Sequence, residues 1–505
     1  MTLFARSARR QWGLCCSATA STAALLLWFL APGCSDHGSS GGPADASAAP
    51  DSGWSDPDSG QPWPACDSVD ATSGFHVTPE GSPDGDGSLE HPWDLQTGLK
   101  FPPGVAPGDT VWVHEGRYQG TFVLKYDGEE GAPITVRAWP GDRVILDGRG
   151  SDGDPVLQIW HQWIVVQDLE ITNSDPDRRS SRPTGIYVGG DHVLLANLVV
   201  HDVGTGISGG QLDDNGHQEG TDILLYGSIF YNNGWLGDDR GHGHHIYLTN
   251  RDSIIRIEDN VIFDAYGSGI HDYSSTDRNY VYHNRIRRNV WFLNGAPGGK
   301  LVDGCLVGHD GTNIVKDIVL EDNYGWALDL GGRDVRLGWD TANEGASLKG
   351  NYFVGLTIFQ REWSDVTIQD NTFIGQLQGL DPSDYPNNEY LSEPPQKNFI
   401  VILPNEYEPG RAHIIVYNWE GLDQVSVDLS SLLPEGTEFD IRSVQDLYHE
   451  PLVSGSYRGG EVTIPMTGID PTPPIGDPDA IPQDWRTGKD FNVFLLRAAL
   501  CPPSK

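Results

Sequence analysis

The chain has 505 residues, and its 71 acidic and 33 basic side chains give a formal net charge of −38 at pH 7. This excess of negative charge argues against a nucleic-acid-binding protein, because no lysine-rich stripe offsets the repulsion from phosphates. Without the N-terminal segments described next, roughly 440 residues remain, which is more than one ordinary domain but normal for a solenoid with an appended module.

The first 33 residues are typical of a signal peptide. Arg6, Arg9 and Arg10 precede the apolar run STAALLLWFLAPG, in the order of the charged and hydrophobic regions of such a leader. This run is too short and too early to favour a membrane-spanning helix. Cys34 follows Ala-Pro-Gly and resembles the lipidated cysteine of a bacterial lipoprotein. We therefore expect a protein that is either secreted or held on the outer surface of a bacterial cell by a lipid on Cys34.

Residues 34–66 form a predicted disordered linker, because the segment is rich in Ser, Gly, Pro and Asp and has too few apolar residues to fold. Three cysteines remain for pairing: Cys66 at the end of this linker, and Cys305 and Cys501 beyond it. Three cysteines permit at most one disulfide, and the sequence does not decide the pair, although Cys66 and Cys501 both border the predicted folded region. The cysteine spacing does not suggest zinc.

The folded part begins near Gly74 with a strand, a turn-rich loop and a short helix that carries Trp93, Leu95 and Leu99 on one side. We expect this helix to cover the open end of the first coil of a solenoid. The stretch from HPW through PGDTVWVHEGRY to GAPITVRAWPG is similar to the N-terminal region of chondroitinase-B-like and alginate-lyase-like polysaccharide lyases.

One short phrase then recurs along the chain. GIYVGG, GISGGQ, HIYLTN and GIHDYS begin at residues 185, 206, 245 and 269, and each is followed by a second run of alternating apolar residues. Repeats at intervals of roughly 20–40 residues are typical of solenoids, whose short strands must stack to share a core. The alternation of strand side chains predicts one inward ladder, which consists of Ile186, Ile207, Ile246 and Ile270.

Asparagines form a second predicted ladder, because they follow an apolar strand in successive coils. The members are Asn197, Asn260, Asn284, Asn323, Asn351 and Asn371, with Asp168 and Gly227 in the equivalent place of two further coils. Asparagine tolerates the left-handed turn conformation, and its amide can bond to the next coil. In this respect the sequence resembles the right-handed parallel β-helix proteins of the pectate-lyase-like superfamily. The alternatives, a β-propeller or a β-sandwich, need tight hairpins, and few NG or DG turns separate these strands.

After Gly379 the pattern changes to strands at hairpin-like spacing without an asparagine ladder, such as AHIIVYNWE and FNVFLL. We predict an antiparallel β-sandwich over residues 381–505. It would either bind glycan or brace the end of the solenoid, and bracing is favoured. The predicted fold is therefore all-β: a right-handed parallel β-helix with an N-terminal cap over residues 67–380, followed by the sandwich.

Strand alternation also predicts which side chains face outward. His245 and Tyr247 take such positions in one coil, and His271 and Tyr273 take them in the next, about 4.8 Å away. Four such side chains beside a shelf of glycines would suit sugar rings, which have apolar faces and a polar edge; the alternative is that they only decorate a solvated strand. Three inserts would wall a groove around them: residues 173–184, 211–220 and 234–243.

Two chemistries are open at this patch. A lyase removes the proton α to a uronate carboxylate and needs a base and a cation on that carboxylate. His271 or Tyr247 is the candidate base. We expect Asp272 to point inward, so that either the strand ends or twists there or Asp272 bonds to a turn or a neighbouring His. Either arrangement would fix the His271 imidazole and place its pKa near the working pH. A hydrolase needs two carboxylates, roughly 5–5.5 Å apart for retention or 6.5–9.5 Å apart for inversion, and the acidic residues offer too many pairs to select among.

The candidate residues fall into three groups by role. The catalytic candidates are His271, Tyr247, His245, Tyr273 and Arg278. The substrate-binding candidates are Arg178, Arg182, Trp235, Asp238, Asp239 and Arg287. The candidates for a calcium site are Asp213, Asp214 and Glu219. The catalytic lysine of the lyases cannot be placed, because the coils from Gly185 to Gly299 contain none and Lys300 is the first after them.

We therefore expect a secreted or lipid-anchored monomer that acts on an extracellular polysaccharide, with no nucleic-acid partner and no membrane contact except through a lipid. A lyase that cleaves a uronate-containing glycan is favoured modestly over a glycoside hydrolase. The competing class is a non-catalytic surface protein that binds glycan.

Overall fold

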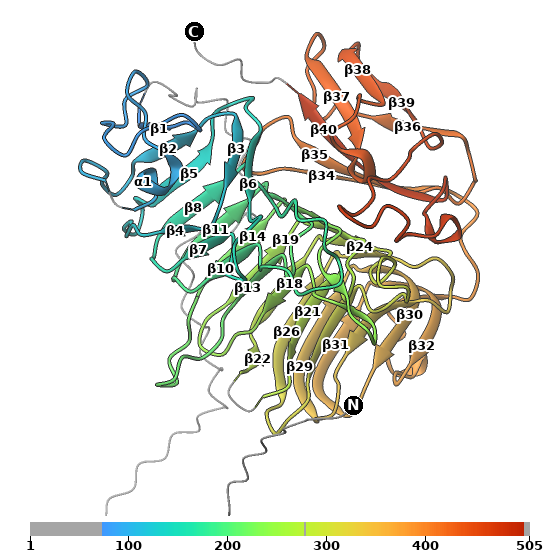
Figure 1. Ribbon diagram of the computed structural model, residues 1–505. Coiled ribbons are helices and arrows are strands. Elements are labelled where there is room, and N and C mark those ends of the chain that lie inside the picture. Colours follow the sequence, from blue (N-terminus) through green and yellow to red (C-terminus); the bar gives the residue numbers. More distant parts are fainter. Residues whose placement is uncertain (1–72, 101, 277–278, 499–505) are drawn as a thin grey trace, which may run out of the picture. The chain divides into compact units, whose positions relative to one another are not determined.

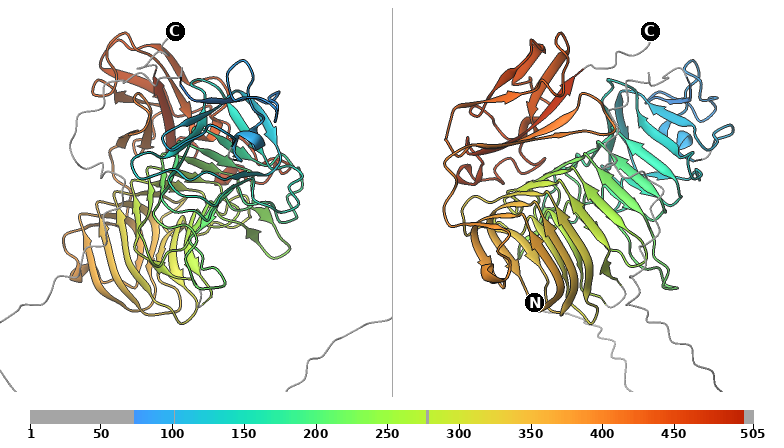
Figure 2. Two further views of the ribbon diagram at one scale, coloured as in Figure 1. Left: turned by 90° about the vertical axis from the view of Figure 1, so that its left-hand side faces the viewer. Right: turned by 180° about the vertical axis from the view of Figure 1, so that it is seen from behind.

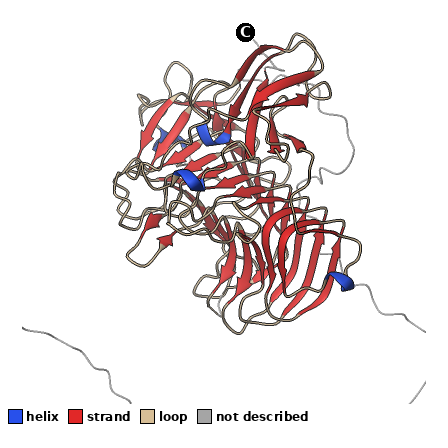
Figure 3. Ribbon diagram, turned by 90° about the vertical axis from the view of Figure 1, so that its right-hand side faces the viewer, coloured by secondary structure: helices blue, strands red, loops and turns tan. Residues whose placement is uncertain are grey.

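The computed structural model describes residues 73–100, 102–276 and 279–498. Over these residues the chain is a right-handed parallel β-helix followed by antiparallel sheets (Figure 1). Strands make up nearly all of the regular structure, and the helices are few and short (Figure 3). The predicted signal peptide, the linker, Cys34, Cys66, Cys501 and Arg278 lie outside the described residues. None of the described helices is long and apolar enough to cross a membrane.

Each coil of the helix contributes a strand to three parallel ribbons, whose stacking is visible from behind in Figure 2. The first ribbon consists of β1 (Phe75–Val77), β2 (Thr110–Val113), β5 (Ile134–Ala138), β8 (Ile164–Gln167), β11 (Val193–Ala196), β14 (Ile223–Tyr226), β19 (Ile255–Glu258), β23 (Asn284–Arg287), β26 (Val315–Glu321), β29 (Asn343–Lys349) and β31 (Trp363–Gln369), with β22 (Val281–Tyr282) beside β26.

The second ribbon carries the recurring phrase. It consists of β4 (Phe122–Leu124), β7 (Leu157–Ile159), β10 (Ile186–Val188), β13 (Ile207–Gly209), β18 (Ile246–Leu248), β21 (Ile270–Ser274), β25 (Cys305–His309) and β28 (Arg333–Leu337). The third ribbon consists of β3 (Gly116–Gln119), β6 (Val144–Asp147), β9 (Glu170–Thr172), β12 (Val199–His201), β15 (Ile229–Tyr231), β20 (Val261–Phe263), β24 (Val290–Phe292) and β27 (Tyr324–Trp326). The two ribbons merge in the long strands β30 (Tyr352–Phe359) and β32 (Thr372–Gln378).

The inward isoleucine ladder is confirmed by the strand register. Ile186 pairs with Ile207, which pairs with Ile246, which pairs with Ile270. All four side chains are fully buried in the core of the helix. The ladder continues to Cys305, a buried free thiol whose pKa burial raises well above the usual value.

The asparagine ladder exists, but its membership differs from the prediction. The stack consists of Asn260, Asn289, Asn323, Asn351, Asn371 and Asn388, and each side-chain amide donates to the side-chain oxygen of the next. Asn284 is not a member, because it lies inside β23 and donates instead to Asp272. The corner takes two residues: a left-handed residue, such as Asp168, Asn197 or Gly227, and then the stacked position. The prediction assigned these three residues to the stacked position, whereas they occupy the left-handed position directly before it.

The N-terminal cap is as expected. Helix α1 (Leu95–Gly98) is capped by Asp94, whose side chain accepts the backbone N–H of Thr97. Trp93, Leu95 and Leu99 are buried against the first coils.

The helix runs further than the predicted boundary at residue 380. After a 3-10 turn at Pro382–Asp384, β33 (Glu389–Leu391) still pairs in parallel with β32. Antiparallel pairing begins with β34 (Phe399–Pro404), in a five-stranded sheet that also contains β35 (Ala412–Tyr417), β40 (Phe491–Ala498), β37 (Glu438–Ser443) and β38 (Val453–Ser456). The facing pair is β36 (Gln424–Asp428) with β39 (Glu461–Pro465), and further 3-10 turns occupy Val444–Asp446 and Gln483–Trp485.

The C-terminal module packs on the outer face of the third ribbon. Phe292 and Trp326 of the helix meet Phe491 of β40, each with ring centroids 5.2 Å apart. Tyr417 of β35 donates to the backbone oxygen of Gly325 at 3.0 Å. The outer face of the third ribbon is therefore covered, whereas the second ribbon keeps an accessible outer face.

Candidate functional site

The outer face of the second ribbon carries a row of aromatic side chains. Tyr247 of β18 and His271 of β21 lie on successive coils, with ring centroids 5.3 Å apart. Tyr273 follows on the same strand, 4.9 Å from His271. Trp339, which comes after β28, closes the row against Tyr273 at 5.7 Å. The sequence therefore correctly placed three of its catalytic candidates together on one face.

His244, rather than His245, joins this row. Its ring stacks on His271 with centroids 3.8 Å apart and an interplanar angle of 3°. The backbone N–H of Ser268 donates to His244 Nδ1, so the neutral ring carries its proton on Nε2. We call Tyr247, His271, Tyr273 and His244 the aromatic row.

The prediction that His245 faces outward is wrong. The strand begins only at Ile246, so His245 lies in the preceding corner and its ring turns inside. There Asn233 donates to His245 Nδ1, and His245 Nε2 donates to the backbone oxygen of Phe263, each at 2.8 Å. Other coils have glycine at this corner; a Cβ on Gly206 would lie 2.4 Å from the His245 oxygen. Period-two alternation does not extend into such a corner.

A cavity of about 540 Å³ opens beside the aromatic row. Its walls include Asp239, Arg240, His244, Tyr266, His271, Tyr273, Lys300, Asp303, Arg333 and Trp339. A second cavity, of about 340 Å³, shares Arg240 and His244 with the first and reaches Ser208, Gln211, Trp235 and Tyr247. Together the two cavities, which we call the groove, follow the second ribbon over several coils.

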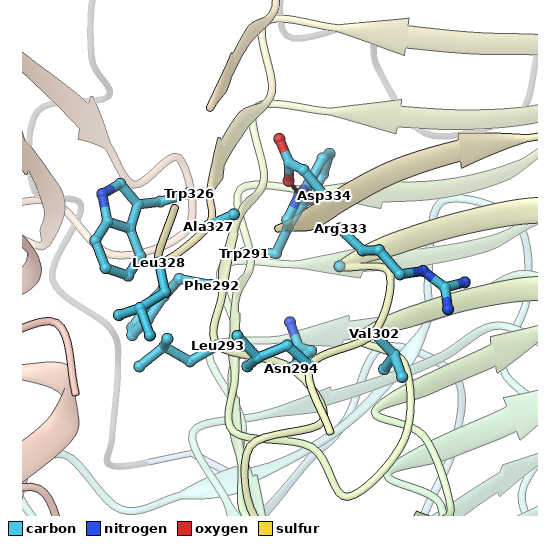
Figure 4. A pocket seen from close by; sticks show the side chains of 12 residues that line it. Trp291, Phe292, Leu293, Asn294, Val302, Trp326, Ala327, Leu328, Arg333 and Asp334 are labelled. Atoms are coloured by element: carbon cyan, nitrogen blue, oxygen red, sulfur yellow. Dashed lines mark hydrogen bonds between the residues drawn. The ribbon is translucent and has the colours of Figure 1, made fainter. Parts of the chain in front are cut away.

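Three cations border the larger cavity. Arg333 is held by Asp303, which also accepts from Arg336. Figure 4 shows the Arg333 guanidinium pointing away from Trp326 and Leu328, the apolar side of a small neighbouring pocket. Arg240 lies 3.7 Å from Asp239, and both side chains are exposed. Lys300 is exposed and forms no ion pair with any described residue. The sequence patterns missed these cations, because all three enter from loops or at a strand start outside the recurring phrase.

The two stacked imidazoles are neutral at pH 7. Burial lowers the pKa of His271 well below its usual value, and the nearby His244 and Arg240 lower it further. Burial and Arg240 likewise lower the pKa of His244 to about 4. The Nδ1 atom of His271 is buried and has no hydrogen-bond partner.

Asp272 does not orient His271, contrary to the expectation. Its carboxylate points into the core and accepts from Asn284 Nδ2 at 2.6 Å. Burial raises the pKa of Asp272 to about 7. The group that titrates near neutral pH is thus the buried carboxyl, while the pKa of His271 is not near the working pH.

The tyrosines keep their protons. Burial, and then the charge of Asp272, raise the pKa of Tyr247. Burial, and then Asp310, raise the pKa of Tyr273 well above its usual value. Both phenols are therefore proton donors rather than bases at neutral pH.

The assignment of Arg178 and Arg182 to substrate binding is wrong. Both side chains are buried and donate to backbone oxygens, Arg178 to those of Asn232 and Ile475 among others. Arg182 donates to the backbone oxygen of Asp202 and to three others within the insert. They hold the insert at 173–184 in place because a long loop cannot satisfy its own buried carbonyls.

The remaining substrate-binding candidates divide between the groove and other surfaces. Trp235 stacks on His242 at 5.4 Å and lines the smaller cavity. Asp239 lines the larger cavity, and Asp238 lies exposed beside it in the turn between β16 (Trp235–Leu236) and β17 (Gly241–His242). Arg287 is on the first ribbon and pairs with Glu321 at 3.4 Å, so it does not line the groove.

The calcium candidates do not form a metal site. Asp213 accepts the backbone N–H groups of Asn215 and His217 in its own loop. Glu219 instead accepts from the hydroxyl of Tyr187. Nowhere among the described residues do three or more His, Cys, Asp or Glu side chains gather so as to hold a metal ion. Asp213, Asp214 and Glu219 are therefore not part of such a group.

A family model described as "Pel9A-like, right handed beta helix region" matches residues 75–253. This stretch is similar to the Pel9A-like right-handed β-helix family. The resemblance predicted from the repeats and ladders is thus confirmed, and the matched region includes the strands from β1 to β18 and the hairpin with Arg240.

Solved structures with a similar fold include pectate lyase Pel9A, at 16% identity over 59% of this chain and 78% of that one, with a TM-score of 0.38. An alginate lyase from Paenibacillus sp. str. FPU-7 is 14% identical over 58% of this chain and 96% of that one, with a TM-score of 0.36. XylC, solved in complex with xylose, is 12% identical over 83% of this chain and 99% of that one, with a TM-score of 0.42.

A curated relative, the uncharacterized protein YwoF of Bacillus subtilis (strain 168), is 27% identical over 138 residues. The match covers 26% of this chain and 29% of that protein. The chain thus spans less than a third of the length of this relative.

Proposed function

We propose that the protein is a polysaccharide lyase that cleaves a uronate-containing glycan by β-elimination in the groove. The observation that carries this proposal is the meeting of neutral imidazoles, protonated phenols and cations around one cavity of about 540 Å³. The cations suit a polyanion, and the rings suit sugar faces.

The reaction assigns one role to each kind of side chain. The uronate carboxylate binds against Arg240 and Lys300, and their charge stabilises the negative charge that develops when the α-proton leaves. His271 takes that proton. The electron pair forms a C=C bond and expels the glycosidic oxygen, which receives a proton from Tyr247 or Tyr273.

Substrate binding would itself prepare the base. Arg240 is one of the groups that lower the pKa of His271 in the free protein. A carboxylate bound beside Arg240 offsets that charge and favours the protonated imidazole. His271 is therefore neutral before binding and becomes a stronger base once the polyanion is in place.

A glycoside hydrolase is less well supported, because the carboxylates at the cavity are engaged. Asp303 is shared by Arg333 and Arg336 and is almost fully buried. Asp239 bonds to His242 at 2.8 Å and faces Arg240. A hydrolase needs one carboxyl to donate a proton and the second to act as base or nucleophile.

A panel of uronate polymers, with ultraviolet absorbance read for new C=C bonds, tests the proposal. We expect absorbance to rise with at least one polymer and to stay flat for the His271→Ala variant. New reducing ends without absorbance would establish a hydrolase. Binding on a glycan array without any cleavage would establish a non-catalytic binder.

We also propose that the protein acts outside the cell and is anchored through Cys34, which lies outside the described residues. The support is the leader-like composition of the first 33 residues. Radiolabelled palmitate should enter the wild-type chain and not the Cys34→Ala variant. Equal labelling of both chains would rule out Cys34 as the acylated residue, and labelling of neither would indicate simple secretion.

A further inference from the structure

An exposed aromatic pair lies on the second ribbon, beyond the groove described above. Trp160 follows β7 and has 44% of its surface exposed, which makes it one of the few large apolar side chains in the described chain that faces solvent. Tyr187 of β10 lies beside it, with ring centroids 5.0 Å apart and an interplanar angle of 43°. Neither residue lines the two cavities of the groove.

The Trp160 ring is held in place by its surroundings. Its Nε1 donates to Gln158 on the preceding strand at 3.1 Å. Its six-membered ring rests over Gly189, where a Cβ would come within 2.6 Å of the ring. Tyr187 is fixed from the other side, because its hydroxyl donates to Glu219 of the insert at 211–220. An exposed tryptophan supported in this way is an ordered surface rather than a mobile side chain.

The pair is aligned with the aromatic row. Gln158 pairs with Tyr187, Tyr187 with Ser208, and Ser208 with Tyr247. Figure 1 shows the five strands β7, β10, β13, β18 and β21 in succession along the helix. The four steps from β7 to β21 amount to roughly 19 Å at about 4.8 Å per step. Ser208 already lines the smaller cavity, so the surface is continuous from Tyr187 to His271.

We propose that Trp160 and Tyr187 form a distal sugar-binding platform, and that the polysaccharide lies along the helix axis with one sugar ring on this platform and its cleaved bond at His271. The inference rests on the proposed function for the identity of the ligand. A sugar ring fits because it stacks its apolar face on an aromatic ring and turns its hydroxyls to water. Only an oligosaccharide of several units spans both places, so the platform makes affinity depend on chain length.

The test uses size-defined oligosaccharides of polygalacturonate and of alginate, from disaccharide to decasaccharide. Binding is measured by calorimetry in a His271→Ala background, which prevents cleavage. We expect affinity to rise with length until the platform is reached. Trp160→Ala should remove that last gain, about three- to tenfold.

A second variant removes the platform without deleting the ring. Gly189→Ala places a methyl group where the Trp160 ring rests, and its backbone conformation does not require glycine. It should cause the same loss as Trp160→Ala. The matched control is Leu422→Ala, which deletes an equally exposed apolar side chain, 43% exposed, from the C-terminal module and should change nothing.

The outcomes separate the platform from the activity. Cleavage with no effect of Trp160→Ala on length dependence would overturn the platform and leave the lyase proposal intact. Length-dependent binding that requires Trp160, without cleavage by the wild-type chain, would overturn the lyase and keep the platform. Binding to none of the oligosaccharides, together with no cleavage of any polymer in the uronate panel, would overturn both. A concentration-dependent dimer in sedimentation that Trp160→Ala abolishes would show that a second copy, not a sugar, covers this surface.

Discussion

His244 and His245 are adjacent in the chain but face opposite surroundings. His244 stacks on His271 at the groove, whereas His245 is enclosed and bonded through both ring nitrogens. His271 itself is only partly buried, and its role in the proposed reaction is to accept a proton. The three residues therefore allow chemistry and folding to be separated by single substitutions.

We expect His271→Ala to lower the rate of cleavage about 10²–10⁴-fold, because it removes the general base. Its free energy of unfolding should fall by only about 1 kcal/mol, since the side chain is only partly buried. Absorbance assays and urea denaturation measure the two quantities. His245→Ala is the control: it should cost about 3 kcal/mol, because Asn233 and the Phe263 carbonyl lose their buried partner. A His271→Ala enzyme that stays active would show that the aromatic row only binds.

Asp272 should make the protein less stable as the pH rises. Its pKa is about 7 in the folded chain because of burial, against about 3.9 in an unfolded chain. Between these values the folded state holds a proton that the unfolded state has lost, so the free energy of unfolding falls as pH rises from about 4 to about 7 and then levels off. Asp272→Asn should remove this slope and be the more stable protein at pH 8. Urea denaturation at several pH values measures it, and parallel curves for the two proteins would contradict it.

The strand register can be predicted from the repeats, but the positions of the residues at the corners between strands cannot. Each phrase predicted its inward isoleucine correctly, because burial of one face fixes the register of a strand. The predicted positions of several corner residues differ by one from those in the structure. A left-handed residue precedes each stacked asparagine, and the sequence does not mark where a strand stops. Asn284 and His245 were misplaced for this one reason. Lys300 and Arg333 were missed for another: the course of the coils determines where they enter the groove, and no local pattern reports it.

Asparagines in the middle of the stack should contribute more to the free energy of unfolding than those at its ends. Asn323 accepts from the backbone and side chain of Asn289 and donates to Asn351 and to the Ile286 carbonyl. Asn323→Ala would leave several buried groups without partners and should cost about 2–4 kcal/mol. Asn388→Ala, at the half-buried end of the stack, should cost about 1 kcal/mol. Equal losses by urea denaturation would show that the stack is not cooperative.

The C-terminal module and the helix share one apolar cluster along the third ribbon. Loop residues reinforce it: Asp202 accepts the backbone N–H of Ile475, and Asn232 donates to the Thr472 carbonyl. The module thereby reaches the base of the insert that Arg178 holds. Bracing, the role that the sequence favoured, is supported by these contacts, and the two parts should unfold together.

Phe491→Ala tests this coupling. The ring contacts Phe292, Trp326 and Tyr417, and its loss should cost about 3–5 kcal/mol. Because both parts lose packing, calorimetry should show one transition that moves to lower temperature as a whole. Two separate transitions, with only the smaller one shifted, would mean that the C-terminal module unfolds independently of the β-helix.

The groove takes its side chains from two sources that differ in how freely they can change. Tyr247 and His271 are part of the strand ladder, where any slip of register would disturb the core beneath. Arg240 and Lys300 come from loops that leave the coil and return to it. Loops tolerate replacement and insertion far better than strands do. The proposed reacting groups are thus tied to the scaffold, while the cations proposed to bind the polymer lie on loops that can be exchanged. If the proposed function holds, a library of grafted loops on this one helix would change which glycan is accepted and leave the strand residues His271 and Tyr247 in place.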